Sequence, residues 1–174
     1  MNKDIEEIFL SEEQINEICK KMGDEITKDY AGKEPVFIGY MKGALPFMTE
    51  LLKRVDLKCT VEYLRIKSYE GTVSTGKIEV IGGLPDVKGK DVIIVEDILD
   101  TGHTLVESMK FFKEANSVKI AVLLDKFEAR KFPIEADYVG VKIPKKFVVG
   151  FGLDYNENYR NLPYIGVLKK EVYM

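Results

Sequence analysis

The chain has 174 residues, 45% of them hydrophobic, and a formal net charge of −3, so we expect one domain with a hydrophobic core and no basic face for nucleic acid. Two cysteines, Cys19 and Cys59, without a CxxC spacing argue against a disulfide framework or a structural zinc and favour a reducing cytoplasm. The acidic N-terminal segment lacks a signal-peptide pattern, and no apolar run approaches the ~20 residues of a membrane span.

The first half of the chain predicts alternating helices and strands. Residues 11–14 (SEEQ) form a capping-box pattern, and the apolar residues after them lie on one helical stripe. PVFIGY (35–40) is β-branched and aromatic and predicts a buried strand, and ALPFMTELLKR (44–54) predicts the helix that follows. Apolar residues alternate over 57–63, as in a half-buried strand, whereas the polar, glycine-containing segment 67–79 predicts a long mobile loop.

The second half predicts a parallel sheet. VIIV (92–95) and VKIAVLL (118–124) are apolar runs that predict buried strands, and Leu105, Met109 and Phe112 have helical spacing between them. This order of apolar strands and a helix predicts an α/β fold with a mainly parallel sheet flanked by helices.

The sequence after Pro133 is aromatic and interrupted by glycine and proline, which predicts a last core strand and then a small cap over the site. We therefore expect a single domain over residues 1–174. Its core would span about 30–143, and a hood would combine the N-terminal segment with about 144–174.

Three acids and a Thr- and Gly-rich turn follow the strand over 92–95. Glu96 and Asp97 stand at its carboxyl end, where parallel α/β sheets bind ligands. Backbone N–H groups of the turn DTGHT and of the helix start can hold a phosphate, and Thr101 and Thr104 add hydroxyl donors. Carboxylates accept hydrogen bonds from hydroxyls or share a divalent cation. The stretch therefore predicts a site for a ribose 5-phosphate.

Asp100 lies in the turn, between the residues assigned to the sugar and those assigned to the phosphate. In one interpretation it accepts a proton from the group that attacks the sugar. In the other it is the N-cap of the following helix, a position that aspartate often fills. Spacing alone does not choose between a base and a cap.

The full stretch VIIVEDILDTGHTL (92–105) resembles the phosphoribosyl pyrophosphate signature of the purine and pyrimidine phosphoribosyltransferases. Further motifs narrow the resemblance to the hypoxanthine-guanine phosphoribosyltransferases and extend it over about residues 35–165; they are MKG, KSY, STG, IGG, LLDK and KFVVGFGLDYNENYR. The resemblance implies the phosphoribosyltransferase fold. It also implies transfer of 5-phosphoribosyl from phosphoribosyl pyrophosphate to N9 of hypoxanthine or guanine, with release of pyrophosphate.

The resemblance assigns the ribose-phosphate site to the same stretch. Glu96 and Asp97 would hold the ribose hydroxyls, directly or through water and Mg²⁺, and Asp100 would take the N7 proton of the purine as N9 attacks. The residues that would hold the 5-phosphate are Thr101, Gly102, His103 and Thr104. His103 occupies a variable position of the family, and we expect it to donate to the phosphate without acting as a base.

The pyrophosphate site would consist of Met41, Lys42 and Gly43, with Arg160 as a bidentate clamp. The family has a non-proline cis peptide bond before this lysine, which turns backbone N–H groups toward the ligand, and we expect it between Met41 and Lys42. Met41 replaces the usual leucine. Without the family, Lys42 would be interpreted as a surface lysine before a helix.

The purine site would combine two side chains and several backbone groups. Lys126 would donate to the 6-oxo group, and Phe147 would stack on the base; the alternatives are a snorkelling lysine and a core aromatic. The other residues assigned to the purine are Ile98, Val148, Leu153 and Asp154. The Asp154 side chain would also bind a second Mg²⁺ on the pyrophosphate.

The resemblance further implies a closing loop and an oligomer. Ser68 and Tyr69 match the Ser-Tyr pair of a loop that closes during the reaction and excludes water. Relatives form dimers and tetramers, so we expect a homodimer or a homotetramer. The expected partners are phosphoribosyl pyrophosphate and a 6-oxopurine base, without nucleic acid or membrane.

Two other functions compete with this one. A regulator built on the same fold would lack the base-reading cap or would carry a basic face. A phosphoacceptor receiver domain would have its acidic pair near the first strand and a separate acceptor aspartate. The motifs around Lys126 and Arg160 and the negative net charge favour the enzyme.

Overall fold

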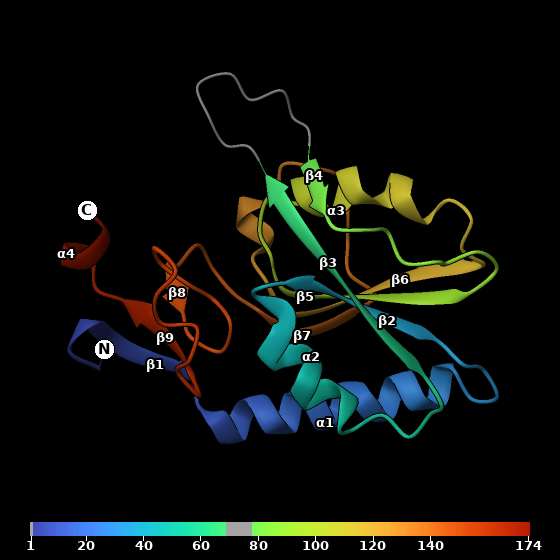
Figure 1. Ribbon diagram of the computed structural model, residues 1–174. Helices are drawn as coiled ribbons and strands as arrows, with labels where there is room; N and C mark the ends of the chain where they lie inside the picture. The colour runs from blue at the N-terminus through green and yellow to red at the C-terminus, as the bar shows by residue number, and fades with distance from the viewer. Residues whose placement is uncertain (1, 69–77) are drawn as a thin grey trace.

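The computed structural model describes residues 2–68 and 78–174 (Figure 1). In chain order its elements are η1 (Asn2–Asp4), β1 (Ile5–Leu10), α1 (Glu12–Asp29), β2 (Val36–Met41), α2 (Ala44–Leu52), β3 (Thr60–Ser68), β4 (Ile78–Ile81), β5 (Asp91–Leu99), α3 (His103–Ser108), η2 (Met109–Phe112), β6 (Ser117–Asp125), η3 (Phe127–Ala129), β7 (Tyr138–Lys142), β8 (Val148–Val149), β9 (Ile165–Leu168) and α4 (Lys170–Tyr173). None of the described helices is long and apolar enough to cross a membrane.

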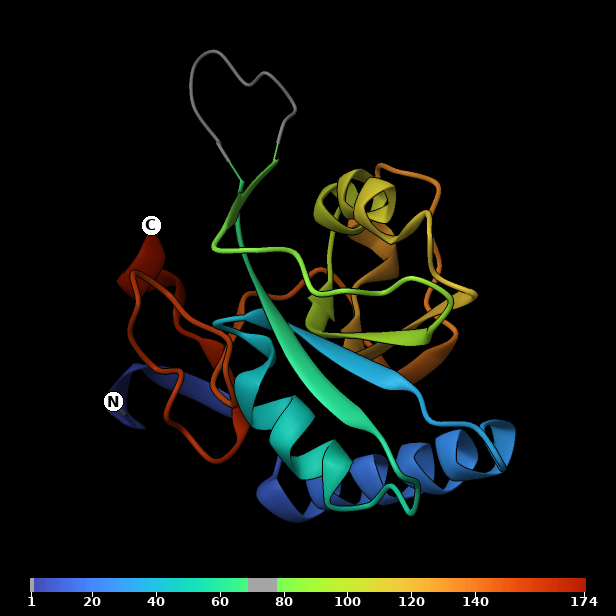
Figure 2. The same cartoon turned by 45° about the vertical axis from the view of Figure 1, so that its right-hand side comes forward.

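A six-stranded sheet in the order β4-β3-β2-β5-β6-β7 forms the centre of the molecule. Every neighbouring pair is parallel except β3 with β4. Helices α1 and α2 cover one face and α3 with η2 covers the other, as Figures 1 and 2 show. The expected α/β fold with a mainly parallel sheet flanked by helices is thus confirmed.

Both faces of the central strands are apolar, which explains why the sheet is covered on both sides. Phe37 of β2 pairs with Ile93 of β5 and packs under α1 and α2, whereas the next pair, Ile38 with Ile94, packs on the α3 side. All four side chains are fully buried. Successive strand residues point to opposite faces, so an uninterrupted apolar run fills both cores.

A second, three-stranded antiparallel sheet has the order β1-β9-β8. It joins the first strand of the chain to the last two, and both chain ends lie at this end of the molecule (Figure 2). Ser11 follows β1 and is the N-cap of α1. Its hydroxyl accepts from the N–H of Gln14 at 3.3 Å, and its own N–H donates to the Gln14 side chain at 2.8 Å. The predicted capping box is confirmed.

Several predicted elements differ in extent from those of the structure. Strand β5 continues four residues beyond Val95, because it stays paired with β6 as far as Leu99. The predicted helix after it divides into α3 and the 3-10 helix η2. The ends of segment 67–79 belong to β3 and β4, and residues 69–77 lie outside the described part.

The apolar alternation over 57–63 also differs from the expectation of a half-buried strand. Strand β3 begins only at Thr60, and Val61 and Tyr63 are 49% and 67% exposed. Helix α2 packs over β2 and β5 and leaves this part of β3 uncovered. Burial therefore depends here on which neighbouring strand the helix crosses, which alternation does not indicate.

Candidate active site

Two acidic residues lie near the carboxyl end of β5, in the middle of the central sheet. Asp97 is buried and Glu96 is partly buried; the Asp97 carboxylate accepts from the Ile98 N–H at 2.8 Å. Burial, reinforced by the charge of Asp97, raises the pKa of Glu96 well above its usual value, and burial also raises the pKa of Asp97. Ionisation of both carboxylates is therefore unfavourable without a partner, which suits hydroxyl donors or a cation.

The turn after β5 lines a small cavity formed by Glu96 and by the residues from Ile98 to Leu105. Gly102 is the N-cap of α3 and has a φ of 86°, a conformation that favours glycine. The predicted phosphate-binding residues Thr101 to Thr104 all line this cavity. An adjoining cavity shares Glu96 and Thr104 with it and extends to Met41, Gly43 and Arg160. The residues assigned to ribose phosphate and to pyrophosphate are thus neighbours.

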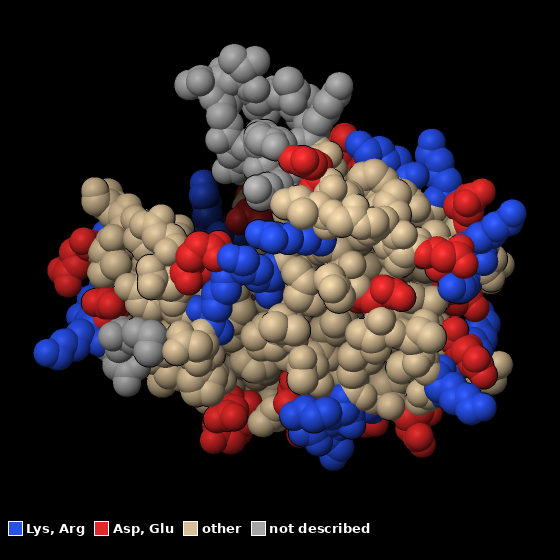
Figure 3. Space-filling view, viewed as in Figure 1, with Lys and Arg blue, Asp and Glu red and all other residues tan. Residues whose placement is uncertain are grey.

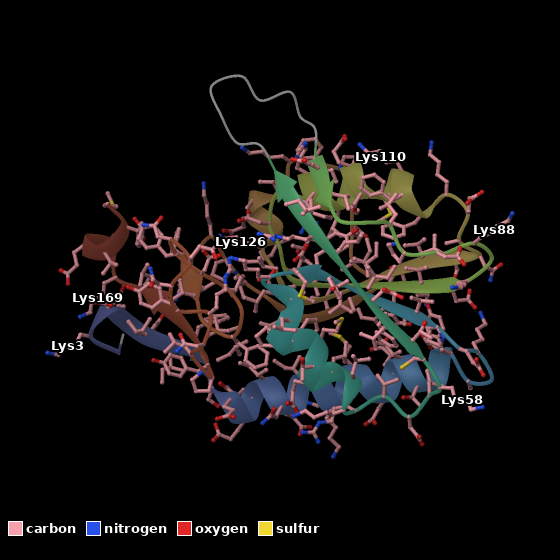
Figure 4. The ribbon with its side chains drawn as sticks, in the orientation of Figure 1. Lys3, Lys58, Lys88, Lys110, Lys126 and Lys169 are labelled. Atoms are coloured by element: carbon pink, nitrogen blue, oxygen red, sulfur yellow. The ribbon has the colours of Figure 1, made fainter. Side chains whose placement is uncertain are left out.

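Asp100 faces Lys126 and does not cap the helix. The N-cap position of α3 belongs to Gly102, without a side-chain cap bond, so the capping interpretation of Asp100 is wrong. The Asp100 Oδ2 lies 3.4 Å from Lys126 Nζ, and the two side chains are 47% and 13% exposed. Figure 4 shows Lys126 between the central sheet and the β1-β9-β8 end of the molecule. The structure therefore brings together the expected proton acceptor and the expected 6-oxo donor.

Phe147 lies immediately before β8 in an aromatic cluster. Its ring stacks on Tyr173 with 4.5 Å between centroids and 14° between planes, and it meets Tyr155 edge-on at 5.7 Å. It is 36% exposed, which differs from a fully buried core aromatic. Val148 and Leu153 are buried in the core, so their backbone groups are what they can offer to a ligand.

The predicted pyrophosphate residues are tied to acids of the loop between β8 and β9. The peptide bond between Met41 and Lys42 is cis, as predicted. The Lys42 ammonium pairs with Glu157, and Arg160 Nη2 lies 3.0 Å from another oxygen of the same carboxylate and 2.9 Å from Asp154 Oδ1. These interactions lower the pKa of Glu157. On the face shown in Figure 3, acidic and basic side chains gather in this region.

Arg160 retains unused hydrogen-bonding capacity. Its Nη1 donates to the Gly152 carbonyl at 2.7 Å, but its Nε is buried and has no hydrogen-bond partner in the described part of the chain. A buried donor without a partner is unfavourable unless a ligand or water accepts from it. The side chain is therefore suited to an anion in the adjoining cavity that it lines.

Two glycines allow the loops of the site to touch. A Cβ atom on Gly43 would lie 2.1 Å from Asp97 Oδ2, and one on Gly152 would lie 2.0 Å from the Gly43 carbonyl oxygen. Gly152 also has a φ of 100°. Any side chain at either position would separate the 41–43 loop from the acids of β5 or from the loop that carries Asp154.

The carboxylates of the site fit a magnesium ion that is bound partly by the protein and partly by phosphate oxygens. Within residues 2–68 and 78–174, no group of three or more His, Cys, Asp or Glu side chains could hold a metal. Glu96 and Asp97 offer two adjacent carboxylates, and Asp154 offers one that now accepts from Arg160 and from the Glu157 N–H at 2.9 Å. Mg²⁺ takes one or two protein carboxylates and completes its shell with phosphate oxygens and water.

Three residues of this region were not predicted from the sequence. Glu157 holds both cations of the predicted pyrophosphate site, Tyr173 covers one face of Phe147, and Arg130 binds the back of the turn that carries Asp100. The contacts of Tyr173 with Phe147, of Arg130 with the Asp100 carbonyl and of Glu157 with Lys42 join distant parts of the chain, so no local spacing signals them. The pairing of Glu157 with Arg160 is local, because the two residues are three positions apart. Of the predicted closing-loop pair, Ser68 ends β3, and Tyr69 lies outside the described residues.

The chain matches the family described as "Phosphoribosyl transferase domain" over residues 5–156. It is 52% identical to a hypoxanthine-guanine phosphoribosyltransferase of Streptococcus pneumoniae, over 99% of this chain and 98% of that one. A crystal structure of a hypoxanthine phosphoribosyltransferase from Staphylococcus aureus is 49% identical with a TM-score of 0.96, over 100% and 97% of the two chains. A Trypanosoma cruzi hypoxanthine phosphoribosyl transferase, studied for the role of its C-terminal region in oligomeric state and activity, is 35% identical with a TM-score of 0.92, over 98% and 95%.

Proposed function

The chain belongs to the hypoxanthine-guanine phosphoribosyltransferases, and on this premise we propose how its residues divide the reaction. The enzyme transfers the 5-phosphoribosyl group of phosphoribosyl pyrophosphate to N9 of hypoxanthine or guanine, giving IMP or GMP and pyrophosphate in purine salvage. The C1′–O bond to pyrophosphate breaks with its electron pair on the departing oxygen, the N9–C1′ bond forms, and a proton leaves N7. Rate enhancement comes from holding both substrates and offsetting the charge that develops.

The observation that carries this proposal is the 3.4 Å separation of Asp100 and Lys126. The 6-oxo oxygen and N7 lie side by side on one edge of a 6-oxopurine. Lys126 donates to the oxygen, and Asp100 accepts the N7 proton as N9 attacks. An ammonium group has only donors, so the 6-amino group of adenine is disfavoured at this position.

The remaining roles follow the two cavities. Glu96 and Asp97 bind the ribose hydroxyls, and Thr101, Gly102, His103 and Thr104 bind the 5-phosphate. Met41, Lys42 and Gly43 present backbone groups to pyrophosphate, and Arg160 clamps it. The buried, unpartnered Nε of Arg160 supports this last role.

The purine is held on its other sides by the loop around β8. Phe147 stacks on the base, Ile98 packs against it, and the backbone of Val148, Leu153 and Asp154 binds its far edge. The partial exposure of the Phe147 ring supports the stacking role. Ser68 and Tyr69 belong to a loop that closes over the reacting groups and excludes water.

Mg²⁺ supplies charge neutralisation for the pyrophosphate when it is bound. Glu96 and Asp97 hold one ion, directly or through water, and Asp154 holds a second. The raised pKa values of Glu96 and Asp97 support a cation at that position.

At the level of the whole chain, we propose one domain with a core over about residues 30–143, which helix α1 of the N-terminal segment covers on one face, and a hood. The hood combines β1 with the segment from about 144 to 174; the shared β1-β9-β8 sheet supports this division. We also propose a cytoplasmic homodimer or homotetramer.

The test is an assay with phosphoribosyl pyrophosphate, with and without Mg²⁺, on hypoxanthine, guanine, xanthine, adenine and uracil. We expect turnover with the first two bases, little with the last two, and none in chelator. Efficient use of adenine would overturn the assignment of Lys126, and full activity in chelator would overturn the metal assignments.

A further inference from the structure

One arginine binds the back of the turn that carries Asp100. Arg130 follows η3, its side chain is 17% exposed, and all three of its guanidinium nitrogens donate. Nε donates to the Asp100 carbonyl at 3.0 Å, Nη2 to the Leu99 carbonyl at 3.3 Å, and Nη1 to the Ile134 carbonyl at 2.6 Å. Nη2 also pairs with the Asp125 carboxylate. One guanidinium group thus connects the ends of β5 and β6 to residue 134.

Three consecutive carbonyls of this turn face the segment 126–132. Besides Arg130, Leu99 O accepts from the Lys126 N–H at 2.9 Å, and Thr101 O accepts from the N–H groups of residues 131 and 132 at 3.0 and 3.1 Å. In a planar trans peptide, the carbonyl of one residue and the N–H of the next point in opposite directions. Fixing the carbonyls of residues 99–101 therefore turns the N–H groups of residues 100–102 the other way, toward the cavity that the turn lines.

We propose that Arg130 is a positioning residue for the 5-phosphate, because it fixes two of the three peptide planes whose N–H groups meet that group. The Asp125 carboxylate balances the guanidinium charge, so the effect is one of orientation and not of attraction at a distance. Gly102 completes the arrangement, since a Cβ atom there would lie 3.1 Å from Arg130 Cδ and 2.7 Å from an Ile134 methyl group. The inference depends on the proposed phosphate site.

The test compares GMP with guanosine, which differ only in the 5-phosphate, by calorimetric binding to the wild type and to Arg130→Gln. The phosphate preference is the dissociation constant of guanosine divided by that of GMP. We expect Arg130→Gln to reduce this ratio about 10-fold or more, since charged hydrogen bonds that orient the turn are lost, while guanosine binding changes by less than about 2-fold. Arg54→Gln, which removes an exposed arginine paired with Glu50 on α2, is the matched control and should leave the ratio unchanged.

Two further variants keep the test valid if Arg130→Gln does not fold. Arg130→Lys keeps the charge but lacks the planar fork, so it should lose most of the phosphate preference. Asp125→Asn removes the charge of the carboxylate that pairs with the Arg130 guanidinium, so it should cause a smaller loss of the phosphate preference. Equal weakening of GMP and guanosine, or an unchanged ratio in the folded variants, would overturn the role of Arg130. A wild type that binds GMP no better than guanosine would instead overturn the phosphate site itself.

Discussion

On the core side of the active site, the functional groups are attached to strand ends, whereas on the hood side they are attached to loops. Strand β5 is paired on both sides, and Asp97 and the turn after it are fixed by backbone hydrogen bonds. The loop between β8 and β9 contains four non-glycine residues with positive φ, and its charged groups are held by side-chain ion pairs. Those four residues are Phe151, Asn156, Glu157 and Tyr159.

The core side is therefore a preformed site, whereas the charged side chains at the hood side are already paired with other side chains. The carboxylates of β5 and the residues of the turn already line their cavities, so a ribose phosphate bound as proposed would meet groups that need little rearrangement. Lys42 and Arg160, by contrast, are paired with Glu157 and Asp154. In the proposed complex, pyrophosphate must therefore displace carboxylates from Arg160 before that side chain can clamp it. Changes on the core side should affect the chemical step or stability, and changes on the hood side should affect pyrophosphate binding.

The largest effect is expected for Asp100→Asn. An amide cannot accept the N7 proton, so kcat should fall by about 10²- to 10⁴-fold, while the dissociation constant of phosphoribosyl pyrophosphate stays close to that of the wild type. Single-turnover kinetics and direct binding measure the two quantities separately. Asp86→Asn, at an exposed aspartate paired with Lys90, is the control. A kcat within about 2-fold of the wild type would remove Asp100 from the chemistry.

Gly43→Ala should come next, because the new methyl group would lie 2.1 Å from Asp97 Oδ2. We expect a loss of about 1–3 kcal/mol in the free energy of unfolding, measured in urea, together with a higher KM for phosphoribosyl pyrophosphate. The control is Gly83→Ala, where an added Cβ meets nothing within 4 Å. Equal stability of the two variants would show that the 41–43 loop can move away from β5 freely.

Glu96→Gln tests the unfavourable ionisation of the core-side carboxylates through pH. Burial and Asp97 raise the pKa of Glu96 in the folded protein, so its ionised form destabilises the ligand-free fold above that raised pKa. In chelator at neutral pH, the variant should melt a few degrees higher, since 1 kcal/mol is worth about 2–4 °C at this chain length. The difference should shrink as the pH falls toward 4.5, the ordinary value, because the folded wild type then takes up a proton. A difference in Tm that is constant with pH would contradict this account.

The smallest effect is expected for Glu157→Gln, on the hood side. The change removes an exposed competitor for Lys42 and Arg160, so the KM for phosphoribosyl pyrophosphate should fall about 2- to 5-fold with kcat nearly unchanged. Glu17→Gln, which breaks an exposed ion pair with Lys21 on α1, should change neither parameter. A higher KM in Glu157→Gln would mean that the carboxylate helps to hold the cations for the ligand.

The parts of the molecule that the sequence predicted well are those with local causes. Ser11 and Gln14 are three residues apart and form the cap of α1, and the apolar run over 92–95 forms the buried centre of β5. The acids and the turn after that run also lie within one short stretch, so their shared cavity could be predicted from spacing and from the fold rule for strand ends.

The parts that could not be predicted depend on distant partners. Strand β5 reaches Leu99 because β6 pairs with it that far, and the exposure of Tyr63 depends on where α2 crosses the sheet. The contacts of Arg130 and of Glu157 join segments that only the folded chain brings together. No periodicity or motif length carries such information, so the roles of these two residues cannot be predicted from the sequence.

The pairing of β1 with β9 has a consequence for how the protein is made. Residues 36–142 contain every strand of the central sheet, so that sheet can assemble on a ribosome while β9, at 165–168, is still inside the exit tunnel. The smaller sheet forms only after Ile5 to Leu10 meets the last strand, across almost the whole length of the polypeptide. A nascent chain would therefore form the central sheet first and the β1-β9-β8 sheet of the hood last.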